Sequence, residues 1–108
     1  MANPHRIVVV EELFLARFLC TALRRMGYDA GSCMSEQVCE LMESGQVDLL
    51  VTNTPAAFAA FGSVVPLLYT AAFPDAAQAA GFRRWLPLRK PFQNAELVSA
   101  VRSLLSKG

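Results

Sequence analysis

The sequence has little charge and no excess of either sign. Of its 108 residues, 18% are charged, against about 25% in an average globular protein, and the formal net charge is +1. Domains that bind DNA or RNA usually carry a clear basic excess, so we expect no nucleic-acid partner. Disorder is also disfavoured, because 54% of the residues are apolar and can supply a buried core.

Cysteine and histidine are scarce too. The three cysteines, Cys20, Cys33 and Cys39, form no C-x-x-C pair, and His5 is the single histidine. This pattern argues against a disulfide framework, a zinc site and thiol catalysis. Glycine-rich phosphate loops are missing as well, so the sequence does not indicate an enzyme. We interpret the cysteines as reduced thiols of a cytoplasmic protein.

No uninterrupted apolar run is long enough to cross a membrane. The stretch between Asp48 and Asp75 lacks charge, but prolines and a glycine break it. A spanning helix needs about 20 predominantly apolar residues with its backbone hydrogen bonds intact. We therefore expect no membrane partner. The N-terminal apolar run of four residues is likewise too short for a signal peptide.

Short apolar strands alternate with helices along the chain. The expected strands are 7–10, 28–33, 48–52, 64–69 and 85–88. The expected helices are 13–26, 35–43 with Ser35 as cap, a stub over 55–61, a short helix from Pro74 to Gly81, and 94–106 with Asn94 as cap. Strands without apolar–polar alternation are typical of a sheet covered on both faces. The sequence thus predicts one α/β domain over residues 1–108, a doubly wound parallel five-stranded sheet.

Polar side chains follow the strands where such folds place their sites, at the carboxyl ends. Glu11 and Glu12 follow the first strand, Asn53 the third, Thr70 the fourth and Lys90 the last. Their oxygens could hold a hard cation such as Mg²⁺. Alternatively, Lys90 pairs with Glu11 and no ligand binds. Spacing alone leaves both interpretations open.

The ordered set of motifs resembles the receiver domain of response regulators (the CheY-like family), over essentially the whole chain. The motifs are Val8-Val9-Val10-Glu11-Glu12 with Arg17, Gly27-Tyr28, Asp48-Leu49-Leu50-Val51-Thr52-Asn53, Tyr69-Thr70-Ala71, Ala79-Ala80-Gly81 and Arg89-Lys90-Pro91-Phe92. The resemblance implies the flavodoxin-like strand order 2-1-3-4-5. Compared with that family, the third and fourth helices are shortened.

The resemblance also implies roles for the polar residues. In the family, two acidic residues help hold Mg²⁺, an aspartate is phosphorylated by a histidine kinase, and a hydroxyl and a lysine contact the phosphoryl group. Glu11 and Glu12 match the acidic pair, Thr70 the hydroxyl and Lys90 the lysine, but Asn53 stands at the phosphoacceptor position. A neutral carboxamide cannot attack phosphorus. We expect no cofactor; the alternative is a weak magnesium site at Glu11 and Glu12, whose side chains are one methylene longer than aspartate.

The last strand carries an aromatic and several arginines. Trp85 is a candidate for the aromatic switch residue of the family, two residues out of register; the alternatives are that Pro87 holds this position or that Trp85 fills the core. A candidate partner face for an acidic protein surface consists of Arg83, Arg84, Trp85 and Arg89. A solvated surface patch is the alternative.

Two functions follow from these residues. The first is a degenerate receiver of two-component or phosphorelay signalling, which binds a signalling protein or second domain without being phosphorylated. The second is a switch operated by a ligand or metal in the pocket of Glu11, Glu12, Asn53, Thr70 and Lys90. A homodimer is expected if the shortened helices expose Phe58, Phe61 or Phe82.

Overall fold

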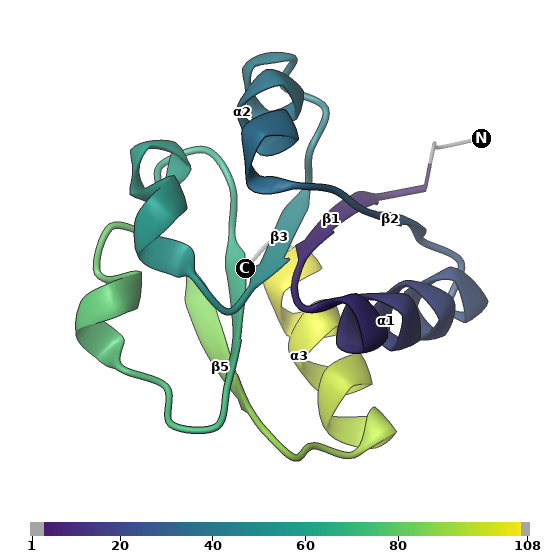
Figure 1. The fold of residues 1–108 in the computed structure, drawn as a ribbon. Helices are drawn as coiled ribbons and strands as arrows, with labels where there is room; N and C mark the ends of the chain where they lie inside the picture. Colours follow the sequence, from purple (N-terminus) through teal and green to yellow (C-terminus); the bar gives the residue numbers. More distant parts are fainter. Residues whose placement is uncertain (1–3, 107–108) are drawn as a thin grey trace.

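Five parallel strands form the centre of the computed structural model, which describes residues 4–106 (Figure 1). The strands are β1 (Arg6–Val10), β2 (Asp29–Ser32), β3 (Leu49–Thr52), β4 (Leu67–Ala71) and β5 (Trp85–Arg89). Their order in the sheet is β2-β1-β3-β4-β5, which confirms the predicted flavodoxin-like order. The outer ends of the predicted domain, residues 1–3 and 107–108, lie outside the described residues.

Helices cover both faces of the sheet. On one face lie α1 (Leu13–Arg25) and α3 (Asn94–Leu105); on the other lie α2 (Ser35–Glu43) and two 3₁₀ helices, η1 (Pro55–Phe61) and η2 (Ala76–Ala79). On β1, Ile7 and Val9 enter the core under α1 and α3, whereas Val8 enters the core on the α2 side. Successive strand residues point to opposite faces, so a continuous apolar run fills two cores.

The two 3₁₀ helices confirm the predicted shortening of the third and fourth helices. Their ends touch at two glycines, because a Cβ on Gly62 would lie 1.8 Å from the carbonyl oxygen of Gly81. Gly62 has an ordinary helical φ of -62°, so space rather than backbone conformation requires glycine here. A longer η1 or η2 would therefore require the chain at Gly62 and the chain at Gly81 to move apart.

The predicted helix caps are wrong. Met34 and Gln93 hold the N-cap positions, and Ser35 and Asn94 are the first helical residues. Before α3, the Glu96 carboxylate accepts a hydrogen bond from the backbone N–H of Gln93 at 2.9 Å. The side chain at the third helical position thus satisfies the N–H of the cap residue, whereas we expected the cap side chain to accept from N–H groups of the helix.

The fourth strand begins later than expected, at Leu67 rather than Val64. Val65 belongs to the turn that follows η1, where its N–H donates to the carbonyl of Phe61 at 3.2 Å. Pro66 lies just before the strand, and its carbonyl accepts from the N–H of Leu50 at 3.1 Å. Because proline has no N–H, it fits at the start of a strand but not within a central one.

The aromatic residues proposed for a homodimer are not exposed. Phe58 and Phe82 are 2% and 5% exposed, and Phe61 packs half-buried against the same core. The short helices cover these rings because η1 and η2 lie against each other. This basis for a homodimer is therefore wrong. Within residues 4–106, no helix has the length and apolar character needed to cross a membrane.

Candidate functional site

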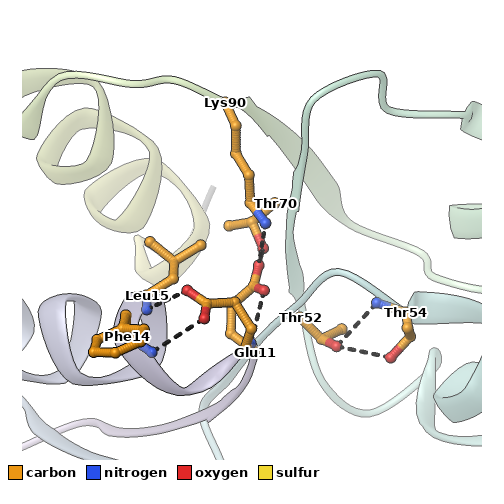
Figure 2. Close-up of polar contacts among 8 residues, drawn as sticks. Glu11, Phe14, Leu15, Thr52, Thr54, Thr70 and Lys90 are labelled. Carbon is orange, nitrogen blue, oxygen red and sulfur yellow. Dashed lines mark hydrogen bonds and ion pairs between the residues drawn. The ribbon is translucent and has the colours of Figure 1, made fainter.

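Glu11 forms the centre of a polar cluster at the carboxyl ends of the strands (Figure 2). Its Oε2 atom lies 2.9 Å from Lys90 Nζ and accepts a hydrogen bond from Thr70 Oγ1 at 2.5 Å. Its Oε1 atom accepts from the backbone N–H of Glu12 at 3.0 Å. The Glu11 side chain is 0% exposed and that of Lys90 is 28% exposed. Glu11 thus forms an ion pair with Lys90, with Thr70 as a further partner, and these contacts join the ends of β1 and β5 to β4.

Glu12 has a different role from its neighbour. It is the N-cap residue of α1, where its two carboxylate oxygens accept from the backbone N–H groups of Leu15 at 2.6 Å and Phe14 at 3.2 Å. A negative charge here satisfies N–H groups that have no partner within the helix, and it interacts favourably with the helix dipole. The two acidic residues expected to act together therefore have different roles: Glu11 pairs with Lys90, and Glu12 caps α1.

These side chains do not fit a magnesium ion. Mg²⁺ needs oxygen ligands in near-ideal octahedral geometry, yet Glu11 is paired with Lys90 and Glu12 is engaged by α1. Across residues 4–106, no three histidine, cysteine, aspartate or glutamate side chains gather as a metal cluster. Of the two interpretations that spacing left open, the geometry favours the lysine–glutamate ion pair.

Asn53 follows β3 next to the end of β1, where Val10 pairs in register with Thr52. It is exposed in the bend that follows β3, between Thr52 and Thr54. The buried Thr52 hydroxyl accepts from the N–H of Thr54 at 3.1 Å and lies 3.2 Å from its hydroxyl, which fixes this turn. Figure 2 shows the threonine pair separated from Glu11 and Lys90. The structure thus presents a neutral amide to solvent at the end of β3.

Comparisons with known proteins give matches only among solved structures. No protein-family model matches the chain, and no curated protein matches it. The chemotaxis protein CheY4 of Vibrio cholerae superposes with a TM-score of 0.79 at 15% identity, covering 94% of this chain and 99% of that one. A response regulator receiver protein from Sinorhizobium medicae gives a TM-score of 0.76 at 21% identity, covering 95% of both chains. The chain has the receiver fold.

Another match, a two-component response regulator from Clostridium difficile, has a TM-score of 0.75 at 16% identity and covers 94% and 95% of the two chains. These likenesses extend over almost the full length of the matched chains. On a receiver fold, the cluster around Glu11 and the exposed Asn53 both lie at the carboxyl edge of the sheet, where ligands of such sheets bind.

Trp85 lies at the opposite end of β5 from Lys90. It pairs in register with Leu67, and its ring centroid is 6.2 Å from that of Tyr69. The side chain packs half-buried against the core on the α2 side. On β5, Pro87 pairs in register with Tyr69 and Leu88 pairs with Thr70, whereas Trp85 lies three residues before Leu88. This geometry supports the core-filling interpretation of Trp85.

The arginines of the predicted partner face are spread along β5. Arg84 donates to the carbonyls of Ser103 and Ser106 at 3.0 and 3.3 Å, at the end of α3. Arg89, five residues on, donates to the Ala72 carbonyl at 3.2 Å. Five residues of strand span about 16 Å. The arginines are thus divided between the two ends of β5, because a strand spreads its residues out along its length.

An exposed apolar group that the motifs did not predict lies beside the site. Leu13 and Phe14 are 67% and 77% exposed in the first turn of α1. Phe18, one turn further along α1, is 50% exposed, and its ring centroid lies 6.2 Å from that of Phe92. Three consecutive large apolar residues, 13–15, were the available signal, since they cannot all face the same core.

The three cysteines are expected to react with iodoacetamide at different rates. Burial raises the pKa of the Cys20 thiol, with Arg24 opposing this effect, and burial also raises the pKa of Cys33, with Arg6 opposing it. Because the thiolate is the reactive form, we expect the exposed Cys39 to be modified first and Cys20 last at pH 7. Peptide mapping over a time course measures this order. Equal rates at Cys20 and Cys39 would contradict the packing of α1.

Proposed function

We propose that this receiver-fold chain is a signalling module that acts without phosphorylation, by binding a signalling protein or a second domain. The observation that carries the proposal is the pairing of Glu11 with Lys90 and Thr70 while Asn53 stands exposed and neutral. The resemblance assigns the lysine and the hydroxyl to the phosphoryl group. Here an internal carboxylate engages both of them.

The ion pair supports a single fixed conformation at this edge of the sheet. A ligand shifts an equilibrium only if it binds two conformations with different affinity. Glu11 already connects β1 to the ends of β4 and β5, which is the connection that an incoming anion beside Lys90 would otherwise make. An anion would have to displace a buried carboxylate from its lysine, which is costly because it leaves that charge unpaired. The module therefore needs no cofactor.

The proposal predicts that the wild-type chain takes up no phosphate at residue 53. We expect unchanged intact mass after incubation with acetyl phosphate and Mg²⁺, because a carboxamide is not a nucleophile toward phosphorus. We also expect the amide NMR signals of Glu11, Thr70 and Lys90 to stay in place when Mg²⁺ and then beryllofluoride are added. The matched variant is Asn53→Asp, which supplies a carboxylate at the same position with little change in size.

Two results would contradict the proposal. Phosphate on residue 53 of the wild-type chain would show that it works as an ordinary receiver. A Mg²⁺-dependent shift of the Glu11 and Lys90 amides in the wild type would favour the alternative, a switch operated by a metal or ligand. A phosphorylated Asn53→Asp variant beside an inert wild type would show that the asparagine alone blocks the reaction.

A further inference from the structure

The solvent-facing side of α1 is apolar at one end and basic along its length. We call the exposed positions of this helix the α1 face: Leu13, Phe14, Arg17, Phe18, Thr21, Arg24 and Arg25. They include three arginines, and the carboxylate of the exposed residue just before the helix, Glu12, accepts hydrogen bonds from the N–H groups of Phe14 and Leu15. Leu13 and Phe14, at 67% and 77% exposed, begin the helix, and two of the arginines lie in its last turn. Large exposed apolar side chains next to charge are typical of protein-binding surfaces.

The solvent-facing side of α2 has the opposite charge. We call its exposed positions, with the exposed residue before them, the α2 face: Met34, Ser35, Glu36, Gln37, Cys39, Glu40 and Glu43. They include three glutamates and no basic residue. The glutamates lie four and three residues apart and therefore form one stripe along the helix. Met34, which is 67% exposed, adds an apolar group at the amino end.

The two faces match in spacing as well as in charge. Arg17 and Arg24 are seven residues apart, and so are Glu36 and Glu43. Seven residues of α-helix span about 10.5 Å, close to two turns. If the helices lie parallel, Arg17 meets Glu36 and Arg24 meets Glu43. The apolar groups at the two amino ends, Phe14 and Met34, then lie at the same end of the contact.

We propose that the α1 face binds the α2 face of a second copy of this chain. The two helices lie on opposite faces of the sheet, either side of β1 (Figure 1). The contact is therefore head-to-tail. An open assembly leaves one α1 face free at one end and one α2 face free at the other. Such a contact extends into chains unless its rotation closes a ring. The proposal does not depend on whether Asn53 takes phosphate.

The association is expected to be weak and sensitive to salt. A single pair of helices buries less than the roughly 800 Å² per partner of a standard interface. Exposed charges guide partner choice and association rate more than they add affinity. Salt screens them, since the Debye length is about 8 Å at physiological ionic strength. The apolar groups at the amino ends supply the part of the binding that salt does not weaken.

Charge reversal tests the proposal by sedimentation velocity at low ionic strength. We expect the wild-type chain to sediment faster as its concentration rises, and added salt to reduce this effect. An α1-reversed variant, Arg17→Glu, and an α2-reversed variant, Glu36→Lys, should each weaken self-association several-fold, because like charges then face each other at the first charge pair. Arg24 is left unchanged because its Nε donates to the carbonyl of Ala30 at 2.8 Å.

Mixing the two variants is the decisive step. The substituted residue 17 of one variant then meets the substituted residue 36 of the other with opposite charge, so an equimolar mixture should associate more strongly than either variant does alone. Arg102→Glu, on the exposed side of α3, is the matched control and should associate like the wild type. Circular dichroism checks that each variant is folded. If a reversed chain is not folded, Arg17→Gln or Glu36→Gln replaces it and should weaken self-association in the same direction by a smaller factor.

Three outcomes would overturn the proposal. A wild-type chain that stays monomeric at every concentration and salt would exclude the second copy and leave an acidic helix of another protein as the occupant of the α1 face. Association that either reversal leaves unchanged would place the contact elsewhere on the surface. A mixture of folded variants that stays monomeric would show that α1 and α2 do not face each other.

Discussion

Replacing Lys90 with methionine is expected to lower the free energy of unfolding by about 2–4 kcal/mol, since removing one partner of a buried ion pair leaves the other charge uncompensated. Methionine keeps much of the length of the side chain but removes its charge. The Glu11 carboxylate, which is 0% exposed, then retains only the Thr70 hydroxyl and the Glu12 N–H as partners. Urea unfolding followed by circular dichroism measures the loss.

The double variant Glu11→Gln/Lys90→Met measures the interaction free energy between the two residues, apart from the cost of each single substitution. We expect Glu11→Gln alone to cost less than Lys90→Met, because Lys90 is 28% exposed and can reach water when its partner is gone. The double variant should be more stable than the sum of the single losses predicts, by about 1 kcal/mol or more, as for residues in direct contact. Strictly additive losses would contradict the ion pair on which the proposed function rests.

Replacing Gly62 with alanine is expected to destabilise the fold by about 3 kcal/mol or more, the upper range for forcing an extra methyl group into a packed interior. The new Cβ would lie 1.8 Å from the carbonyl oxygen of Gly81 and 2.5 Å from its carbonyl carbon. Both are backbone atoms, so no side-chain rotation relieves the overlap. The turns η1 and η2 must separate, which uncovers the core around Phe58 and Phe82. Thermal unfolding measures the effect.

Gly31→Ala is the matched control for this substitution. A Cβ on Gly31 would have no atom within 4 Å, and its backbone conformation is open to other residues. We expect its stability to stay within about 0.5 kcal/mol of the wild type. If the two alanine variants were equally stable, the close contact between η1 and η2, and with it the reason for the short helices, would be wrong.

Much of the fold was predictable because it depends on local patterns. The β-branched run 7–10 and the apolar run 48–52 indicated strands buried on both faces, and the apolar stripe of the last helix indicated one packed side. These patterns report burial directly. The caps of α2 and α3 were not predictable in the same way, because several polar residues near each helix start could satisfy the first N–H groups and the chain direction decides which one does.

The site was predictable as a set of residues but not as an arrangement. Strand ends alone placed Glu11, Asn53, Thr70 and Lys90 at one edge, because all strands run the same way. Whether this set is a cation site or an ion pair depends on distances in space between residues that are far apart in the sequence. Glu11 and Thr70, for example, are 59 positions apart. No local pattern encodes those distances.

The sequence by itself determined the α/β class and the amide at residue 53, since side-chain chemistry needs no coordinates, and its resemblance to receiver domains implied the strand order. Only the tertiary structure decided the separate roles of Glu11 and Glu12. Adjacent residues leaving a strand point in different directions: one carboxylate turns into the sheet edge toward Lys90, and the other turns onto the start of α1. The packing of α1 against β1 and β2 sets the direction in which the chain leaves β1, and so decides that the two carboxylates have separate partners.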